Sequence, residues 1–177
     1  YGPIADMAFL DWLEQNMPAL RVRQHDVLRV AVQRSCEIKA WVVAQDEPEG
    51  GLRALLNLGP TFAHAIEAGM GYGVWLHGEA VGCGLVMAAH LSQRLGLVDA
   101  VFTNRLRQLV QAAGLPVQAP RLAQDAAANV EAWLQHMRVD KKAEGGQIRF
   151  VLPVKPGQAA LAEVDDELVA QTIMQCS

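Results

Sequence analysis

Two histidines separated by thirteen positions are the residues of this chain best suited to chemistry. His64 is followed by Glu67 three residues later, and His77 is followed by Glu79 after a single glycine. Imidazole is the commonest metal ligand in proteins and also a general acid or base near neutral pH. Zinc takes three or four protein ligands, and this pattern offers two imidazoles. Spacing alone therefore leaves both a metal site and an ordinary pair of helical histidines open.

The elements that would position these side chains can be read from the glycines and prolines around them. The sequence Gly-Pro-Thr at residues 59–61 predicts a helix start, because proline is tolerated at the first helical position. His64 then lies one turn inside the helix, and Glu67 shares its face and can orient its ring. Three glycines within residues 69–73 predict the end of the helix and a chain reversal. We expect this reversal to bring His77 back beside His64.

The apolar pattern of the rest of the chain predicts a mainly α-helical fold. Small residues are frequent in residues 79–95, so this helix is expected to be buried and to approach its neighbours closely. Residues 114–124, with two prolines, are expected to form a loop inside the domain. The predicted elements are a helix capped by Asp6 and ended by Pro18, a helix over 27–45 capped by Asp26, helices over 79–95, 101–113 and 125–137, a strand over 148–152, and a terminal helix from Asp165 to Met174.

Composition points to one soluble domain. The chain has 177 residues, of which 51% are hydrophobic, enough for one sizeable core. A net charge of −4 argues against nucleic acid as a main partner. The sequence has neither a run of eighteen apolar residues nor a basic-then-apolar start, so we expect no membrane span and no signal peptide.

The cysteines favour a reducing compartment. Cys36, Cys83 and Cys176 are far apart, odd in number and without a CxxC pair. This pattern indicates neither a zinc ribbon nor a disulfide scaffold, and it fits the cytoplasm. We expect the three thiols to behave as small buried hydrophobic groups rather than as catalytic groups.

Longer stretches of the sequence resemble a known family. Residues 46–59, Thr61-Phe62, His64-Ala65-Ile66-Glu67, Gly71-Tyr72-Gly73 and Trp75-Leu76-His77-Gly78-Glu79-Ala80-Val81 are similar to the signature of 3-dehydroquinate synthase. The likeness begins at Tyr1-Gly2 and continues through Asp140-Lys141-Lys142 and residues 149–153. It therefore covers essentially the whole chain.

The resemblance implies that the chain is one domain of a larger enzyme. Members of the family have an N-terminal domain that binds NAD and a C-terminal helical domain that carries most metal and substrate contacts. Residues 1–177 resemble the second domain, so we expect a single multi-helix domain of the dehydroquinate synthase-like fold with at most one or two short strands. The NAD-binding domain is expected to lie outside this chain, together with a family Ala-Glu-Val-Ile-Lys motif that supplies a zinc ligand and a substrate contact.

The resemblance also assigns roles to individual residues. His77 matches a metal ligand, and His64 matches a catalytic histidine that hydrogen-bonds or transfers a proton near the reacting carbons. Zinc and cobalt are both open as the metal, since imidazole and carboxylate ligands serve either ion. The arginine among the matched substrate residues can hold a phosphate through two parallel hydrogen bonds. The positions that match substrate-binding residues are Lys39, Arg53, Asn57, Lys141 and Lys142.

One residue departs from the family pattern. The family has Gly-His-Thr-Phe-Gly-His, in which the first histidine is a zinc ligand, whereas this chain has Pro60 at that position. Proline has no side-chain lone pair for a metal, so this chain keeps one of the three family ligands, His77. Because proline suits a helix start, we predict that the fold is kept and the metal affinity is lost.

The implied activity is that of the whole enzyme. It converts the seven-carbon sugar acid phosphate DAHP into 3-dehydroquinate and phosphate in the shikimate pathway, through transient oxidation by NAD, phosphate elimination, re-reduction, ring opening and aldol closure. The resemblance further implies a cytoplasmic homodimer, in which this domain alone is inactive. Two alternatives stay open: a related sugar-phosphate cyclase with another substrate, and a non-catalytic helical module that binds a sugar phosphate or a partner protein.

Overall fold

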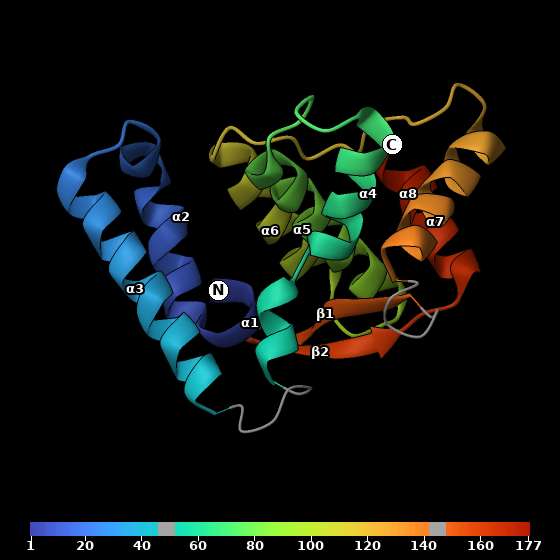
Figure 1. Cartoon of the computed structure of the whole chain (residues 1–177). Helices are drawn as coiled ribbons and strands as arrows, with labels where there is room; N and C mark the ends of the chain where they lie inside the picture. The colour runs from blue at the N-terminus through green and yellow to red at the C-terminus, as the bar shows by residue number, and fades with distance from the viewer. Residues whose placement is uncertain (46–51, 142–147) are drawn as a thin grey trace.

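Helices dominate the computed structural model, which describes residues 1–45, 52–141 and 148–177 (Figure 1). The strands in these ranges form one two-stranded antiparallel sheet, so the expected mainly α fold class is confirmed. The elements are α1 (Gly2–Ala5), α2 (Met7–Arg21), α3 (His25–Ala44), the 3₁₀ helix η1 (Leu52–Asn57), α4 (Pro60–Met70), α5 (His77–Arg94), α6 (Ala100–Ala112), α7 (Ala126–Lys141), β1 (Arg149–Lys155), β2 (Gln158–Glu163) and α8 (Asp166–Cys176).

The core is built around the helix pair α4 and α5. Helices α6 and α8 and strand β1 pack against α5, while α7 packs against α4 (Figure 1). Phe62 and Ile66 of α4 are at most 1% exposed. The ring centroids of Phe62 and of Phe150 on β1 lie 5.2 Å apart. Burial of such side chains contributes roughly 1.5–3 kcal/mol each.

Two glycines set the distance between α4 and α5. Gly59, which precedes α4, has a φ of 100°, a value that favours glycine. A Cβ atom at Gly84 of α5 would lie 2.4 Å from the carbonyl oxygen of Gly59, which is too close for any side chain. The backbones of the two helices meet there directly, as the small residues of 79–95 predicted.

Helices α2 and α3 form a hairpin at one side of this body (Figure 1). Of the 20 residues of α3, only Ile38 and Val42 are buried. Both pack with Phe9 of α2 in a small separate cluster. The hairpin therefore has little apolar core of its own.

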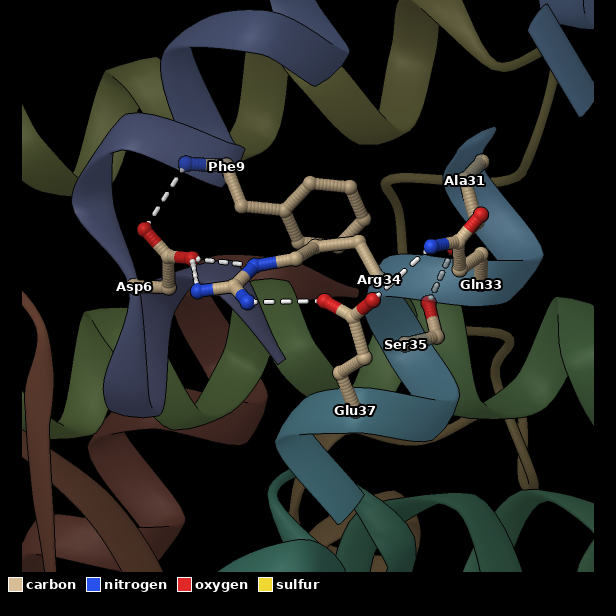
Figure 2. Close-up of polar contacts among 7 residues, drawn as sticks. All are labelled: Asp6, Phe9, Ala31, Gln33, Arg34, Ser35 and Glu37. Carbon is tan, nitrogen blue, oxygen red and sulfur yellow. Dashed lines mark hydrogen bonds and ion pairs between the residues drawn. The ribbon is translucent and has the colours of Figure 1, made fainter. Parts of the chain in front are cut away.

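Polar contacts hold the hairpin in place. Asp6 caps α2 by accepting a hydrogen bond of 3.0 Å from Phe9 N, and its other oxygen accepts bonds of 2.7 and 2.9 Å from Arg34 of α3. Arg34 also donates to Glu37 at 2.9 Å (Figure 2). Burial raises the pKa of Asp6, but these hydrogen bonds outweigh it and leave that pKa below its ordinary value.

A second ionic contact joins α2 to the body. Arg105 of α6 donates to both carboxylate oxygens of Glu14, at 2.6 and 2.8 Å, and also to Asp11. Such a two-point arginine–carboxylate contact fixes direction as well as distance.

The sheet differs from the sequence prediction in two respects. The predicted strand over 148–152 continues through Pro153, which pairs with Ala159, and the register shifts between Pro153 and Lys155. A second strand, β2, pairs along it and was not predicted. Its sequence Gln-Ala-Ala-Leu-Ala-Glu is rich in alanine, which favours helices, so pairing with β1 overrides the local preference.

Several helix boundaries also differ from expectation, and α7, for example, continues to Lys141 although the predicted helix ends at residue 137. Pro18 does not end α2, which continues to Arg21: proline removes one backbone donor, but its carbonyl still accepts from Val22 N at 3.4 Å. Asp26 lies in the first turn of α3, and the capping position belongs to Gln24.

Two of the three cysteines are buried as expected. Burial raises the pKa of Cys83 to about 12 and that of Cys176 to about 11, so both thiols are poor nucleophiles. Cys36 is exposed on α3, contrary to expectation.

No helix in the described ranges is both long enough and apolar enough for a membrane span.

Candidate functional site

The first wall of the site is the start of α4. Gly59 and Pro60 open this helix as predicted, and the amides of Phe62 and Ala63 donate to the Gly59 carbonyl. The Thr61 hydroxyl donates to the carbonyl oxygen of Arg149 at 3.2 Å, which ties this helix start to β1. His64 consequently lies one turn inside α4, with its side chain exposed.

The second wall is the start of α5. Helix α4 ends at Met70, and Gly71 and Gly73 take φ values of 91° and 90°, which let the chain reverse as predicted. Helix α5 then begins at His77, and Glu79 accepts a hydrogen bond of 2.8 Å from Leu76 N. This side chain fixes the backbone that carries His77.

The reversal brings the two histidines together. The rings of His64 and His77 are stacked, with centroids 6.3 Å apart and planes 27° apart. The juxtaposition predicted from the glycine turn is therefore confirmed. Both residues are exposed rather than buried.

The side chain of Glu67 contacts His77, the second histidine. Its carboxylate oxygens lie 3.1 and 3.2 Å from Nδ1 of His77. The Glu67 side chain is 15% exposed and that of His77 is 64% exposed, so the carboxylate is sheltered while the ring faces outward. The sequence indicated Glu67 as a partner of His64, and that role stays a prediction. The pairing with His77 was missed because it spans ten residues and depends on the path of the glycine turn.

Comparison with known sequences decides the family. The family model of the 3-dehydroquinate synthase C-terminal domain matches residues 1–143, most of the chain. The chain belongs to this family. The suspected resemblance is thereby confirmed.

Solved structures share the fold. ValA, a 2-epi-5-epi-valiolone synthase from Streptomyces hygroscopicus subsp. jinggangensis 5008 with NAD⁺ and Zn²⁺ bound, is 20% identical and superposes with a TM-score of 0.76 over 99% of this chain and 48% of its own. A 2-deoxy-scyllo-inosose synthase complexed with carbaglucose-6-phosphate, NAD⁺ and Co²⁺ is 22% identical, with a TM-score of 0.67 over 85% of this chain and 41% of its own. The chain thus spans less than half the length of these enzymes.

The family's substrate positions fall in several parts of the molecule. Lys39 is exposed near the end of α3, and Asn57 is exposed at the end of η1. Helix α3 packs against η1, and η1 leads into α4, but no hydrogen bond or ion pair joins Lys39 or Asn57 to either histidine within the described residues. The side chains of Arg53 and Lys141 and the whole of Lys142 lie outside the described residues. The binding roles of all five stay predictions.

The metal position of the family can be tested against the side chains present. Pro60, His64 and Glu67 occupy positions i, i+4 and i+7 on one face of α4, so residue 60 belongs to the same face as the site. Pro60 offers no ligand there. Within the described ranges, no group of three or more His, Cys, Asp or Glu side chains is placed to hold a metal ion. These residues do not by themselves fit a zinc or cobalt site, and they provide one oriented imidazole.

Proposed function

We propose that this chain is the substrate-side domain of an enzyme that converts DAHP into 3-dehydroquinate and phosphate. The observation that carries the proposal is the stacked pair of His64 and His77, with Glu67 on the second ring, in a domain of the 3-dehydroquinate synthase C-terminal family. Exposed imidazoles of this kind suit hydrogen bonding and proton transfer at neutral pH.

Each part of the domain has its own task in this proposal. His64 would hydrogen-bond or exchange a proton near the reacting carbons, and His77 would be the one ligand that this chain offers to a zinc or cobalt ion whose other ligands come from elsewhere. Lys39, Asn57 and the family's Arg53 and Lys141-Lys142 bind the phosphate and hydroxyls of the sugar acid. NAD would supply the transient oxidation and would be held mainly by the other half of the protein; NAD⁺ is also bound in the structure of ValA.

Two observations favour other candidates. The solved relatives are a valiolone synthase and an inosose synthase, one of them with a sugar-phosphate analogue bound, so a cyclase acting on another sugar phosphate is the second candidate. Pro60 removes a family ligand and favours a non-catalytic domain that keeps the fold. In the enzyme reading, the protein acts as a cytoplasmic homodimer in the shikimate pathway.

Phosphate release from DAHP by the full-length protein that carries this chain tests the proposal. With NAD⁺ and Zn²⁺ present, we expect release above that of a His77→Ala variant, and faster release by a Pro60→His variant because it restores an imidazole on the same face of α4. Release from glucose 6-phosphate but not from DAHP would support the second candidate. Release by the Pro60→His variant alone would show that the native protein keeps the fold without the chemistry.

A further inference from the structure

Two histidine–carboxylate pairs in this protein differ in how they are built. His25 and Asp26 are neighbours in sequence at the start of α3, their closest nitrogen and oxygen are 4.0 Å apart, and their side chains are 93% and 92% exposed. His77 and Glu67 come from different helices, and both carboxylate oxygens lie within 3.2 Å of one ring nitrogen. Water can replace the first contact at little cost, whereas the fold imposes the second.

The second pair has a sheltered partner. The Glu67 side chain is 15% exposed, and it stands on α4 next to Ile66, which is fully buried. Helix α4 is in turn locked to α5 at Gly59 and Gly84. The carboxylate therefore has a defined position relative to the first residue of α5.

The backbone of His77 is held independently of its ring. Glu79 accepts a hydrogen bond from Leu76 N at 2.8 Å and so fixes the first turn of α5. With the backbone held by Glu79 and Nδ1 held by Glu67, little rotational freedom remains for the ring. A ring held in this way can bind a ligand without first losing rotamer entropy.

The chemistry of the contact selects one form of the neutral ring. An ionised carboxylate only accepts hydrogen bonds, so Nδ1 of His77 must carry the proton that it donates to Glu67. In the neutral ring, Nε2 then carries the lone pair. A carboxylate in this position also makes the opposite nitrogen a stronger base or ligand.

We propose that Glu67 is a positioning residue that holds His77 in the Nδ1–H tautomer and leaves Nε2 as the ring nitrogen that faces a ligand. That this ligand is the reacting sugar phosphate or its metal rests on the function proposed above, whereas the tautomer itself does not. The role matters more here than it would with a histidine at position 60, because Pro60 offers no side-chain ligand on the same face of α4.

Nuclear magnetic resonance of the full-length protein labelled with ¹⁵N-histidine tests this proposal. Two-bond ¹H–¹⁵N correlation spectra at about pH 8, above the ordinary histidine pKa of about 6.5, distinguish the two neutral tautomers. A His77→Gln variant identifies the His77 signals. We expect the native ring to show a protonated Nδ1 and an unprotonated Nε2.

The variants separate positioning from folding. Glu67→Gln should relax the tautomer preference, because its amide can either donate to or accept from Nδ1, and Glu67→Asp should restore part of it. Asp26→Asn is the matched control, since it removes a carboxylate beside His25 and should leave the signals of His25 and of His77 unchanged. A native His77 with its proton on Nε2, or a Glu67→Gln spectrum identical to the native one, would overturn the proposal.

These outcomes are distinct from a failure of the proposed function. The spectra need neither substrate nor cofactor. An Nδ1–H tautomer in a protein that releases no phosphate would contradict only the enzymatic assignment. Phosphate release by a protein with the opposite tautomer would contradict only the role of Glu67.

Discussion

The helix pair α4–α5 and the hairpin α2–α3 are stabilised by different forces. Helix α5 alone buries ten residues, and its backbone touches that of α4 at two glycines. The longer α3 buries only two residues, and its Arg34 is hydrogen-bonded to Asp6. Its partner α2 is held to α6 by the hydrogen bonds of Arg105 to Glu14. Packing therefore fixes the part that carries the two histidines, whereas charges and helix caps fix the part that carries Lys39.

This difference has a functional meaning. A site that must hold two rings at a defined separation benefits from the close-packed interior of a protein, which transmits strain and resists small shifts. A lysine that binds an anionic group through one long flexible side chain needs less exact support. The two regions thus offer different precision to the same proposed substrate.

The largest expected effect compares one substitution in both regions. Ile66→Ala removes a fully buried side chain from α4, and Ile38→Ala removes one from the small hairpin cluster. We expect the free energy of unfolding to fall by about 4 kcal/mol at Ile66 and about 2 kcal/mol at Ile38, because the exposed hairpin can collapse around its cavity. Urea denaturation measures both values, and equal losses would contradict the contrast between the regions.

The contact between α4 and α5 can be probed by adding one methyl group. Gly84→Ala places a Cβ atom against the Gly59 carbonyl, so we expect a loss of roughly 2–3 kcal/mol and a change in the His64 and His77 ring signals. Gly78→Ala in the same helix is the control, since its Cβ atom would meet nothing within 4 Å. The comparison would break if both variants had the same stability.

The smallest expected effect concerns the charge on Asp6 and its pH dependence. Asn also caps helices, so Asp6→Asn removes mainly the ionic part of the contact with Arg34, and we expect a loss of about 1 kcal/mol at pH 7. The pKa of Asp6 is lowered in the folded protein, so its stabilisation is present above the unfolded value of about 3.9 and is lost as the pH falls through the lower folded pKa. The difference between native protein and variant should therefore shrink below about pH 4.

Urea denaturation at a series of pH values measures this difference. Asp165→Asn is the matched control, because Asp165 precedes α8 without a side-chain capping bond. Its effect should stay within about 0.5 kcal/mol at pH 7. An Asp6→Asn variant whose deficit stays constant from pH 7 to pH 3 would show that the ion pair does not stabilise the hairpin.

What the sequence could predict depended on how local the cause was. The start of α4 at Pro60, the glycine reversal and the cap at Asp6 were predicted because neighbouring residues determine them. Trp41 lies on α3 close to the buried Ile38 and Val42 in sequence, yet the residue is 54% exposed. Spacing shows which residues share a face, but it does not show whether another element covers that face.

The features that the sequence missed depend on partners far along the chain. Strand β2 exists because β1 lies beside it, against the helix preference of its alanines. The contact of Glu67 with His77 likewise depends on how the loop places α5 beside α4. For the candidate site, the sequence predicted both histidines and their proximity, and the structure showed that the Glu67 carboxylate contacts His77.

Pro153 within β1 has a consequence for the behaviour of the protein in solution. Proline supplies no backbone donor, and the register of the strand shifts directly after it. A strand from another molecule that tried to pair along β1 would meet an irregular stretch of backbone at this point. The edge of β1 is therefore a poor template for edge-to-edge aggregation.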